Sequence, residues 1–138
     1  MKSVEFITEA KSVFGKNYDQ AYDLMIDAID CGPFDGGCVT VAMALQQALG
    51  GEIVVLIGRP TRLSSQESAM HAAVYVNGKL VDGDGAAAPK TFIARFVENE
   101  MAHMGGTITG VRAIAGNDLP EAPRDAGLAK KLAGLLSQ

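Results

Sequence analysis

The sequence predicts an α+β fold in which helices pack against a small, mainly antiparallel β-sheet. Three observations support this prediction. Apolar residues recur at helical spacing before residue 50 and after residue 89. Residues 53–57 are an unbroken run of Val, Leu and Ile, which is typical of a strand buried on both faces. Residues 70–83 form two strand-like runs around Asn77-Gly78, the preferred filling of a two-residue hairpin turn.

The helix breakers between the apolar runs place the elements in order. Gly15 separates the first two helices, Cys38 opens the third after a Gly-rich stretch, and Pro89 opens the fourth. Helices are predicted over residues 3–14, 18–30, 38–49, 89–104 and around 128–136, and strands over residues 52–58, 70–76, 79–83 and 107–115. Residues 82–85, Asp-Gly-Asp-Gly, are predicted to be a polar turn after a strand.

The length and composition indicate one globular unit. The chain has 138 residues, of which 48% are hydrophobic and 20% charged. We expect a single α+β domain over residues 1–117. Residues 118–138 are predicted to be a linker and a C-terminal amphipathic helix that packs on this domain.

Charge and hydropathy argue against several partners. The net charge is −4, Lys and Arg are scattered, and Trp is absent, so nucleic-acid binding is not expected. Glu5 and Glu9 interrupt what would have to be the apolar core of a signal peptide. No apolar run is long enough to cross a bilayer, so we expect a cytoplasmic protein without a membrane partner. The sequence does not indicate an oligomeric state.

The two cysteines differ in their predicted positions. Cys38 begins a helix, where unpaired N–H groups and the helix dipole favour a thiolate. Cys31 follows the end of a helix, where the dipole disfavours one, so it is predicted to be a packing thiol. A cytoplasmic chain keeps both reduced, and a Cys31–Cys38 disulfide is the redox alternative.

A histidine and two carboxylates fall on one face of the predicted hairpin. Regular register around the turn pairs Ala73 with Asp82 and His71 with Asp84. A carboxylate on the same face as His71 can accept its Nδ1–H, which leaves Nε2 to pair with a thiol. Gly83 and Gly85 allow Asp84 to leave the sheet, so Asp82 is the favoured partner and Asp84 the second choice.

Backbone N–H groups before Cys38 are the predicted oxyanion donors. The glycines of this stretch keep bulk away from the sulfur. We expect the N–H groups of Gly36, Gly37 and Cys38 to face an incoming carbonyl, because the stretch holds no Gln that could donate instead.

These residues resemble the transglutaminase-like branch of the papain-like cysteine hydrolases. The resembling segments are FDGGCVTVAMALQQALGGEIVVL and HAAVYVNGKLVDGDG, within residues 34–98, and they are most similar to small bacterial and phage proteins of this type. The resemblance implies a papain-like core in which the Cys-bearing helix packs on the sheet. It implies Cys38 as nucleophile, His71 as general base and acid, and Asp82 as the carboxylate that orients His71.

The sequence supports two hypotheses about function. In the first, the protein is a cysteine hydrolase or acyl transferase (peptidase, amidase, deamidase or transglutaminase) that acts on an amide or thioester, with a protein or peptide substrate. It would work through a thioacyl-enzyme with no cofactor. In the second, it is a non-catalytic papain-like binding protein of phage or bacterial origin. No metal is expected, because His71, His103 and the acidic residues lack a recognised ligand spacing.

Overall fold

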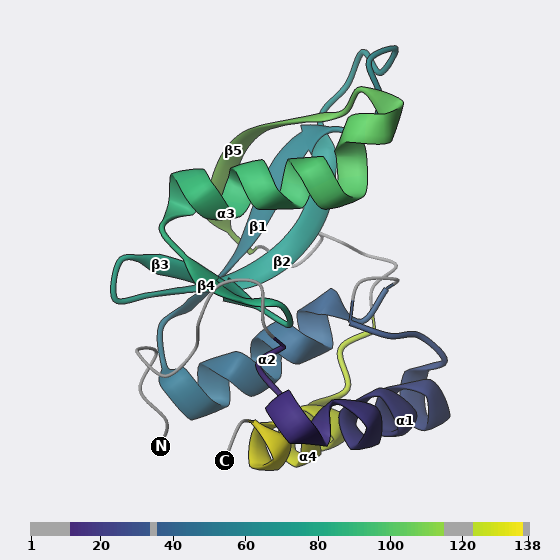
Figure 1. Ribbon diagram of the computed structural model, residues 1–138, viewed down its shortest axis with the longest axis vertical. Coiled ribbons are helices and arrows are strands. Elements are labelled where there is room, and N and C mark those ends of the chain that lie inside the picture. The colour runs from purple at the N-terminus through teal and green to yellow at the C-terminus, as the bar shows by residue number, and fades with distance from the viewer. Residues whose placement is uncertain (1–11, 34–35, 115–122, 137–138) are drawn as a thin grey trace.

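The described part of the chain is a β-sheet with helices on both faces (Figure 1). It comprises residues 12–33, 36–114 and 123–136 of a computed structural model, so most of the helix predicted at residues 3–14 lies outside it. The predicted α+β class is confirmed. The helices are α1 (Tyr18–Ile29), α2 (Cys38–Leu49), α3 (Pro89–Phe96) and α4 (Ala126–Leu135), and the strands are β1 (Glu52–Arg59), β2 (Ser68–Val76), β3 (Lys79–Asp82), β4 (Gly85–Ala87) and β5 (Thr107–Ala113).

The sheet is antiparallel, with strand order β4-β3-β2-β1-β5. The hairpin of β2 and β3 has the predicted register, since Val76 pairs with Lys79 and Tyr75 with Leu80. Asn77 and Gly78 have φ values of 52° and 78°, and positive φ at both central residues is what a type I′ turn requires. The predicted turn is therefore confirmed.

The hairpin register is lost before it reaches the histidine. Pairing of β2 with β3 ends at Val74 and Val81, so the predicted pairs of Ala73 with Asp82 and His71 with Asp84 do not form. Asp82 instead pairs with Gly85 of β4, a strand that the sequence did not predict. Gly85 has a φ of 121°, which a side chain would disfavour, and this allows the chain to reverse tightly after Asp82.

The helix that begins at Pro89 changes its geometry along its length. After α3 it continues as a π-helical turn over Val97–Met101 and a 3₁₀ turn over Ala102–Met104. A constant 3.6-residue period over the predicted helix 89–104 would place Met104 on the same face as Met101. The change of geometry leaves Met104 51% exposed, whereas Met101 is buried. None of the helices in the described residues is long and apolar enough to span a bilayer.

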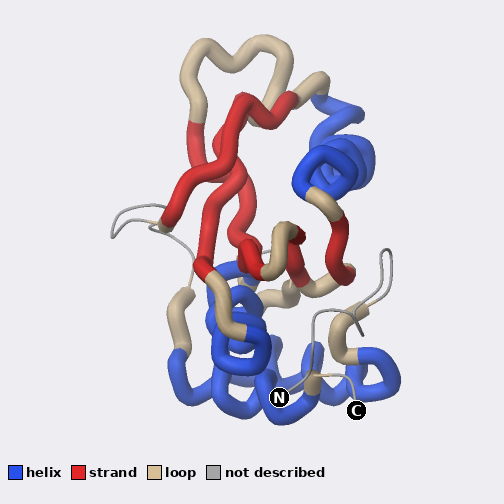
Figure 2. The backbone as a smooth tube through the Cα atoms, turned by 90° about the vertical axis from the view of Figure 1, so that its left-hand side faces the viewer, coloured by secondary structure: helices blue, strands red, loops and turns tan. Residues whose placement is uncertain are grey.

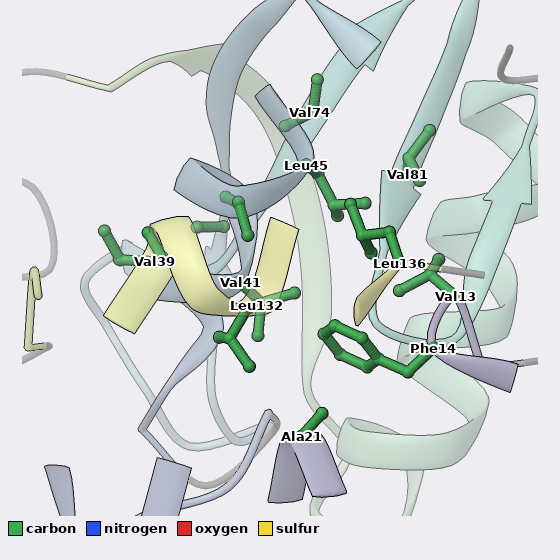
Figure 3. Packing of buried hydrophobic residues seen from close by; sticks show 14 of the residues in the cluster. Val13, Phe14, Ala21, Val39, Val41, Leu45, Val74, Val81, Leu132 and Leu136 are labelled. Atoms are coloured by element: carbon green, nitrogen blue, oxygen red, sulfur yellow. The ribbon is translucent and has the colours of Figure 1, made fainter. Parts of the chain in front are cut away.

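Two apolar cores lie on the two faces of the sheet. In β1, Val55 faces α2, whereas Val54 and Leu56 face α3, as expected for a strand buried on both faces. The larger core brings together α1, α2 and α4 (Figure 3). Figure 2 shows these helices gathered at one end of the sheet, with α3 lying apart from them. The side chains of the larger core include Val13, Phe14, Ala21, Val39, Val41, Leu45, Leu132 and Leu136.

The first turn of α2 is also tied to a distant segment of chain. The Thr40 hydroxyl donates to the Pro123 carbonyl at 2.9 Å and accepts from the Asp125 N–H at 3.3 Å. Asp125 is in turn the N-cap of α4, where its carboxylate accepts from the Leu128 N–H. The start of α2 is therefore held by the residues that start α4.

Candidate active site

Cys38 is the first residue of α2, as predicted, and its side chain is half-buried. The preceding residue, Gly37, has no room for a side chain. A Cβ there would collide with Met25 Cε and lie 2.6 Å from the Gly32 carbonyl oxygen. Close packing of this loop against α1 therefore sets where α2 begins.

The same packing corrects one predicted oxyanion donor. The Gly37 N–H donates to the Gly32 carbonyl at 2.9 Å, so it is not free to face a substrate. The sequence could not predict this loop closure, because it depends on how Gly32 meets the residues before α2. Gly36 and Cys38 remain as the predicted donors.

His71 and Asp82 form a buried pair. His71 Nε2 lies 2.9 Å from Asp82 Oδ2, and the two residues are 3% and 5% exposed. The other oxygen, Asp82 Oδ1, accepts the backbone N–H of Asp84 at 2.8 Å. Of the two carboxylates considered from the sequence, Asp82 contacts His71, while Asp84 helps to hold Asp82 through its main chain.

The ring nitrogens of His71 are used in the opposite sense to the prediction. We expected Nδ1 to bind the carboxylate and Nε2 the thiol, but Nε2 binds Asp82. The same imidazole interacts with the Cys38 thiol and lowers its pKa. Because Nε2 faces Asp82, we infer that this interaction is made through Nδ1. Strand register predicts which side chains are neighbours, but it does not fix the torsion angle that decides which nitrogen faces which neighbour.

The thiol and the imidazole meet beside the part of β2 that is no longer paired with β3. Cys38 packs with the core under α2, whereas His71 stacks on Phe96 on the opposite side of the sheet. Because β3 no longer pairs with β2 beyond Val74, the Ala72 N–H is available and hydrogen-bonds to the Cys38 sulfur. Because the β2–β3 pairing ends early, Cys38 on the α2 side of the sheet can reach His71 on the α3 side.

The pKa of the Cys38 thiol is lowered and the pKa of the His71 imidazole is raised, so both shifts favour the charged form of the group. Burial alone raises the pKa of Cys38, but the hydrogen bond and charge of His71, with the N–H groups of Ala72 and Cys38, lower it below its ordinary 9.0. Burial alone lowers the pKa of His71, but Asp82 and Cys38 together raise it to about 9. A thiolate beside an imidazolium is therefore favoured between the lowered pKa of Cys38 and about pH 9.

Two residues of α3 hold the imidazole and the carboxylate from the other side. The Phe96 ring stacks on His71 with centroids 4.7 Å apart and planes at 19°. Arg95 Nη2 lies 3.7 Å from Asp82 Oδ1, and its guanidinium carbon is 5.0 Å from the Phe92 ring centre. No sequence signal connected α3 with His71.

The shifted pKa values of Cys38 and His71 have opposite effects on how the free energy of unfolding changes with pH. The raised pKa of His71 gives stability that is complete below pH 6.5 and lost as pH rises through about 9. The lowered pKa of Cys38 gives stability that is present above pH 9.0 and lost as pH falls through the folded-state value. At pH values above both 6.5 and the lowered pKa of Cys38, and below about 9, the unfolded chain holds the proton on sulfur and the folded chain holds it on the imidazole. The numbers of bound protons match, so the two effects cancel.

Cys38→Ser is expected to reveal the hidden histidine contribution. Without the thiol, the free energy of unfolding should fall as pH rises above 6.5, by on the order of 1–2 kcal/mol. Urea unfolding of the wild type and of this variant between about pH 6 and pH 9 measures the difference. The double variant with His71→Gln should lose the slope. Parallel pH profiles for Cys38→Ser and wild type would contradict the coupling.

The remaining candidate groups do not join this site. Neither cysteine forms a disulfide, and Cys31 packs against Gly36, where an added Cβ would lie 3.1 Å from the Cys31 sulfur. His103 is exposed in the 3₁₀ turn after α3. Among the described residues, no group of three or more His, Cys, Asp or Glu side chains could hold a metal ion.

Comparisons with known proteins found no match: no protein-family model, no curated protein and no solved structure is similar to this chain. Function is therefore inferred from the residues and their geometry.

Proposed function

We propose that this protein is a cysteine-dependent hydrolase or acyl transferase that acts on an amide or thioester of a protein or peptide. The observation that supports this most strongly is the connected series of Cys38, His71 and Asp82, in which the thiol pKa is lowered at a helix start. The Cys-His-Asp order and the position of α2 on an antiparallel sheet support the resemblance to the transglutaminase-like branch of the papain-like enzymes.

The reaction uses each group in a defined step. The Cys38 thiolate attacks the substrate carbonyl carbon, and the carbonyl electron pair moves to oxygen, where the N–H groups at the start of α2 stabilise the charge. Collapse of this intermediate breaks the bond to the leaving amine or thiol, which takes the proton from His71 Nδ1. Water or an acceptor amine then attacks the thioester carbon and gives its proton to His71; the C–S bond breaks, which releases the acid or amide product and returns Cys38 as a thiolate beside the imidazolium. Asp82 holds the ring through Nε2.

Selective acylation of Cys38 tests this proposal. Brief incubation with an activated ester or an acyl thioester, followed by peptide mass spectrometry, should place the acyl group on Cys38 and not on Cys31. Iodoacetamide should show the same preference, because the His71 imidazole lowers the pKa of the Cys38 thiol. Cys31→Ser should keep the labelling, and Cys38→Ser should lose it.

Other outcomes of this experiment have clear meanings. Equal labelling of both thiols, or preferential labelling of Cys31, would contradict the proposal. Rapid alkylation of Cys38 without transfer of the acyl group to water or an amine would favour the alternative, a non-catalytic binding protein that keeps this fold.

A further inference from the structure

A fourth charged group continues the series beyond Asp82. Arg95 of α3 approaches Asp82 Oδ1, the oxygen that does not bind His71, at 3.7 Å. The side chains of Arg95 and Asp82 are 17% and 6% exposed, so water screens their interaction weakly. The groups therefore run in the order thiol, imidazole, carboxylate and guanidinium from α2 to α3.

We propose that Arg95 is a positioning residue that completes a row of alternating charges with Cys38, His71 and Asp82, and that its charge sets the pH range in which the thiol is reactive. This inference rests on the proposed role of Cys38 as nucleophile. In the reactive form the row holds a thiolate, an imidazolium, a carboxylate and a guanidinium, so its net charge is zero. Without Arg95, the same buried row would carry one negative charge, which disfavours the thiolate.

The contacts of Arg95 favour an electrostatic role over a purely structural one. A separation of 3.7 Å is too long for a hydrogen bond, and Nη1 is buried without a hydrogen-bond partner in the described structure. An unsatisfied buried donor costs stability. The guanidinium lies over the Phe92 ring, and an uncharged side chain of similar length could also pack there.

The other charged groups near Arg95 come from three elements. Asp82 ends β3 and Asp84 lies in the turn that follows. Burial together with the charge of Asp82 raises the pKa of Asp84, against the opposing charges of Arg95 and His71. His71 comes from β2 and Cys38 from α2. On α3 itself, Lys90 is exposed. Because removal of a positive charge raises the pKa of every neighbouring group, loss of Arg95 moves the thiol and the imidazole in the same direction.

The test is the rate of Cys38 alkylation by iodoacetamide, a neutral reagent, as a function of pH. In Arg95→Met, which keeps an apolar stem against Phe92, the rise in rate should move to higher pH by about half to one unit. At a fixed pH on that rise, the rate should fall roughly three- to tenfold. Arg95→Lys should restore the wild-type profile. Lys90→Met, a loss of charge on the exposed side of the same helix, should leave it in place.

The outcomes separate this inference from the proposed function. If the wild-type alkylation rate rises below the ordinary thiol pKa and the rise lies at the same pH in Arg95→Met, the role of Arg95 is overturned and the proposed function is not. An equal displacement in Lys90→Met would also overturn it, because the effect would then belong to general surface charge. Arg95→Gln is a second neutral variant; if neither neutral variant folds while Arg95→Lys does, Arg95 is structural and the inference fails. A wild-type thiol without a lowered pKa would instead contradict the proposed function.

Discussion

Replacing His71 by Gln is expected to lower the rate of Cys38 alkylation near pH 7 by at least about tenfold and acyl turnover by roughly 10²- to 10⁴-fold. Burial is the largest influence on the Cys38 pKa and raises it, while the hydrogen bond and charge of His71 reverse that effect. Without the imidazole, the burial remains and the pKa rises. The thiol is then protonated near neutral pH, and no base remains to deliver a proton to the leaving group.

The measurement is iodoacetamide alkylation followed by mass spectrometry, with thermal melts to confirm folding. His103→Gln is the matched control, because His103 is exposed in the 3₁₀ turn Ala102–Met104 and its loss should change neither rate. A normal alkylation rate in folded His71→Gln would show that His71 does not activate Cys38.

Asp82→Asn should reduce turnover by roughly three to four orders of magnitude while the fold is kept. His71 presents Nε2 to Asp82, so the carboxylate accepts a hydrogen bond from the Nε2–H and leaves Nδ1 able to accept the thiol proton. An Asn amide can donate to Nε2 instead. The proton then sits on Nδ1, facing Cys38, and the imidazole cannot act as a base toward the thiol.

Asp84→Asn is the control for that variant. Asp84 contributes its backbone N–H to Asp82 Oδ1, and this contact survives the substitution. Its effect on turnover should therefore be much smaller. The comparison needs turnover, alkylation rates and melts for both single variants. A normal rate in Asp82→Asn beside a collapsed one in Asp84→Asn would reverse the assignment.

The sequence could predict the local elements that carry the site residues, but not the tertiary contacts between those elements. The start of α2 at Cys38 and the turn at Asn77-Gly78 follow from residue types at neighbouring positions. The choice of Asp82 over Asp84 followed from glycines that allow the chain to turn. Strand β4 was missed, because a three-residue strand of Gly and Ala has no alternating pattern.

The parts that escaped prediction depend on tertiary structure. The contact of Arg95 with Asp82 and the stack of Phe96 on His71 require α3 to cross the sheet face above β3, which no local pattern specifies. The use of Nε2 depends on one side-chain torsion angle. The engagement of the Gly37 N–H depends on a loop closed by the Gly32 carbonyl.

The link between Thr40 and Pro123 has a consequence for when the thiol becomes reactive during protein synthesis. Thr40 lies two residues after Cys38, yet its hydroxyl bonds to a carbonyl 83 residues farther along the chain. While a ribosome is still making the intervening segment, α2 lacks both this anchor and the cover that α4 provides. A nascent chain that already holds Cys38, His71 and Asp82 therefore has an unsupported nucleophile helix. We expect its thiol to gain full reactivity only after residues 123–136 have left the exit tunnel and packed against α2.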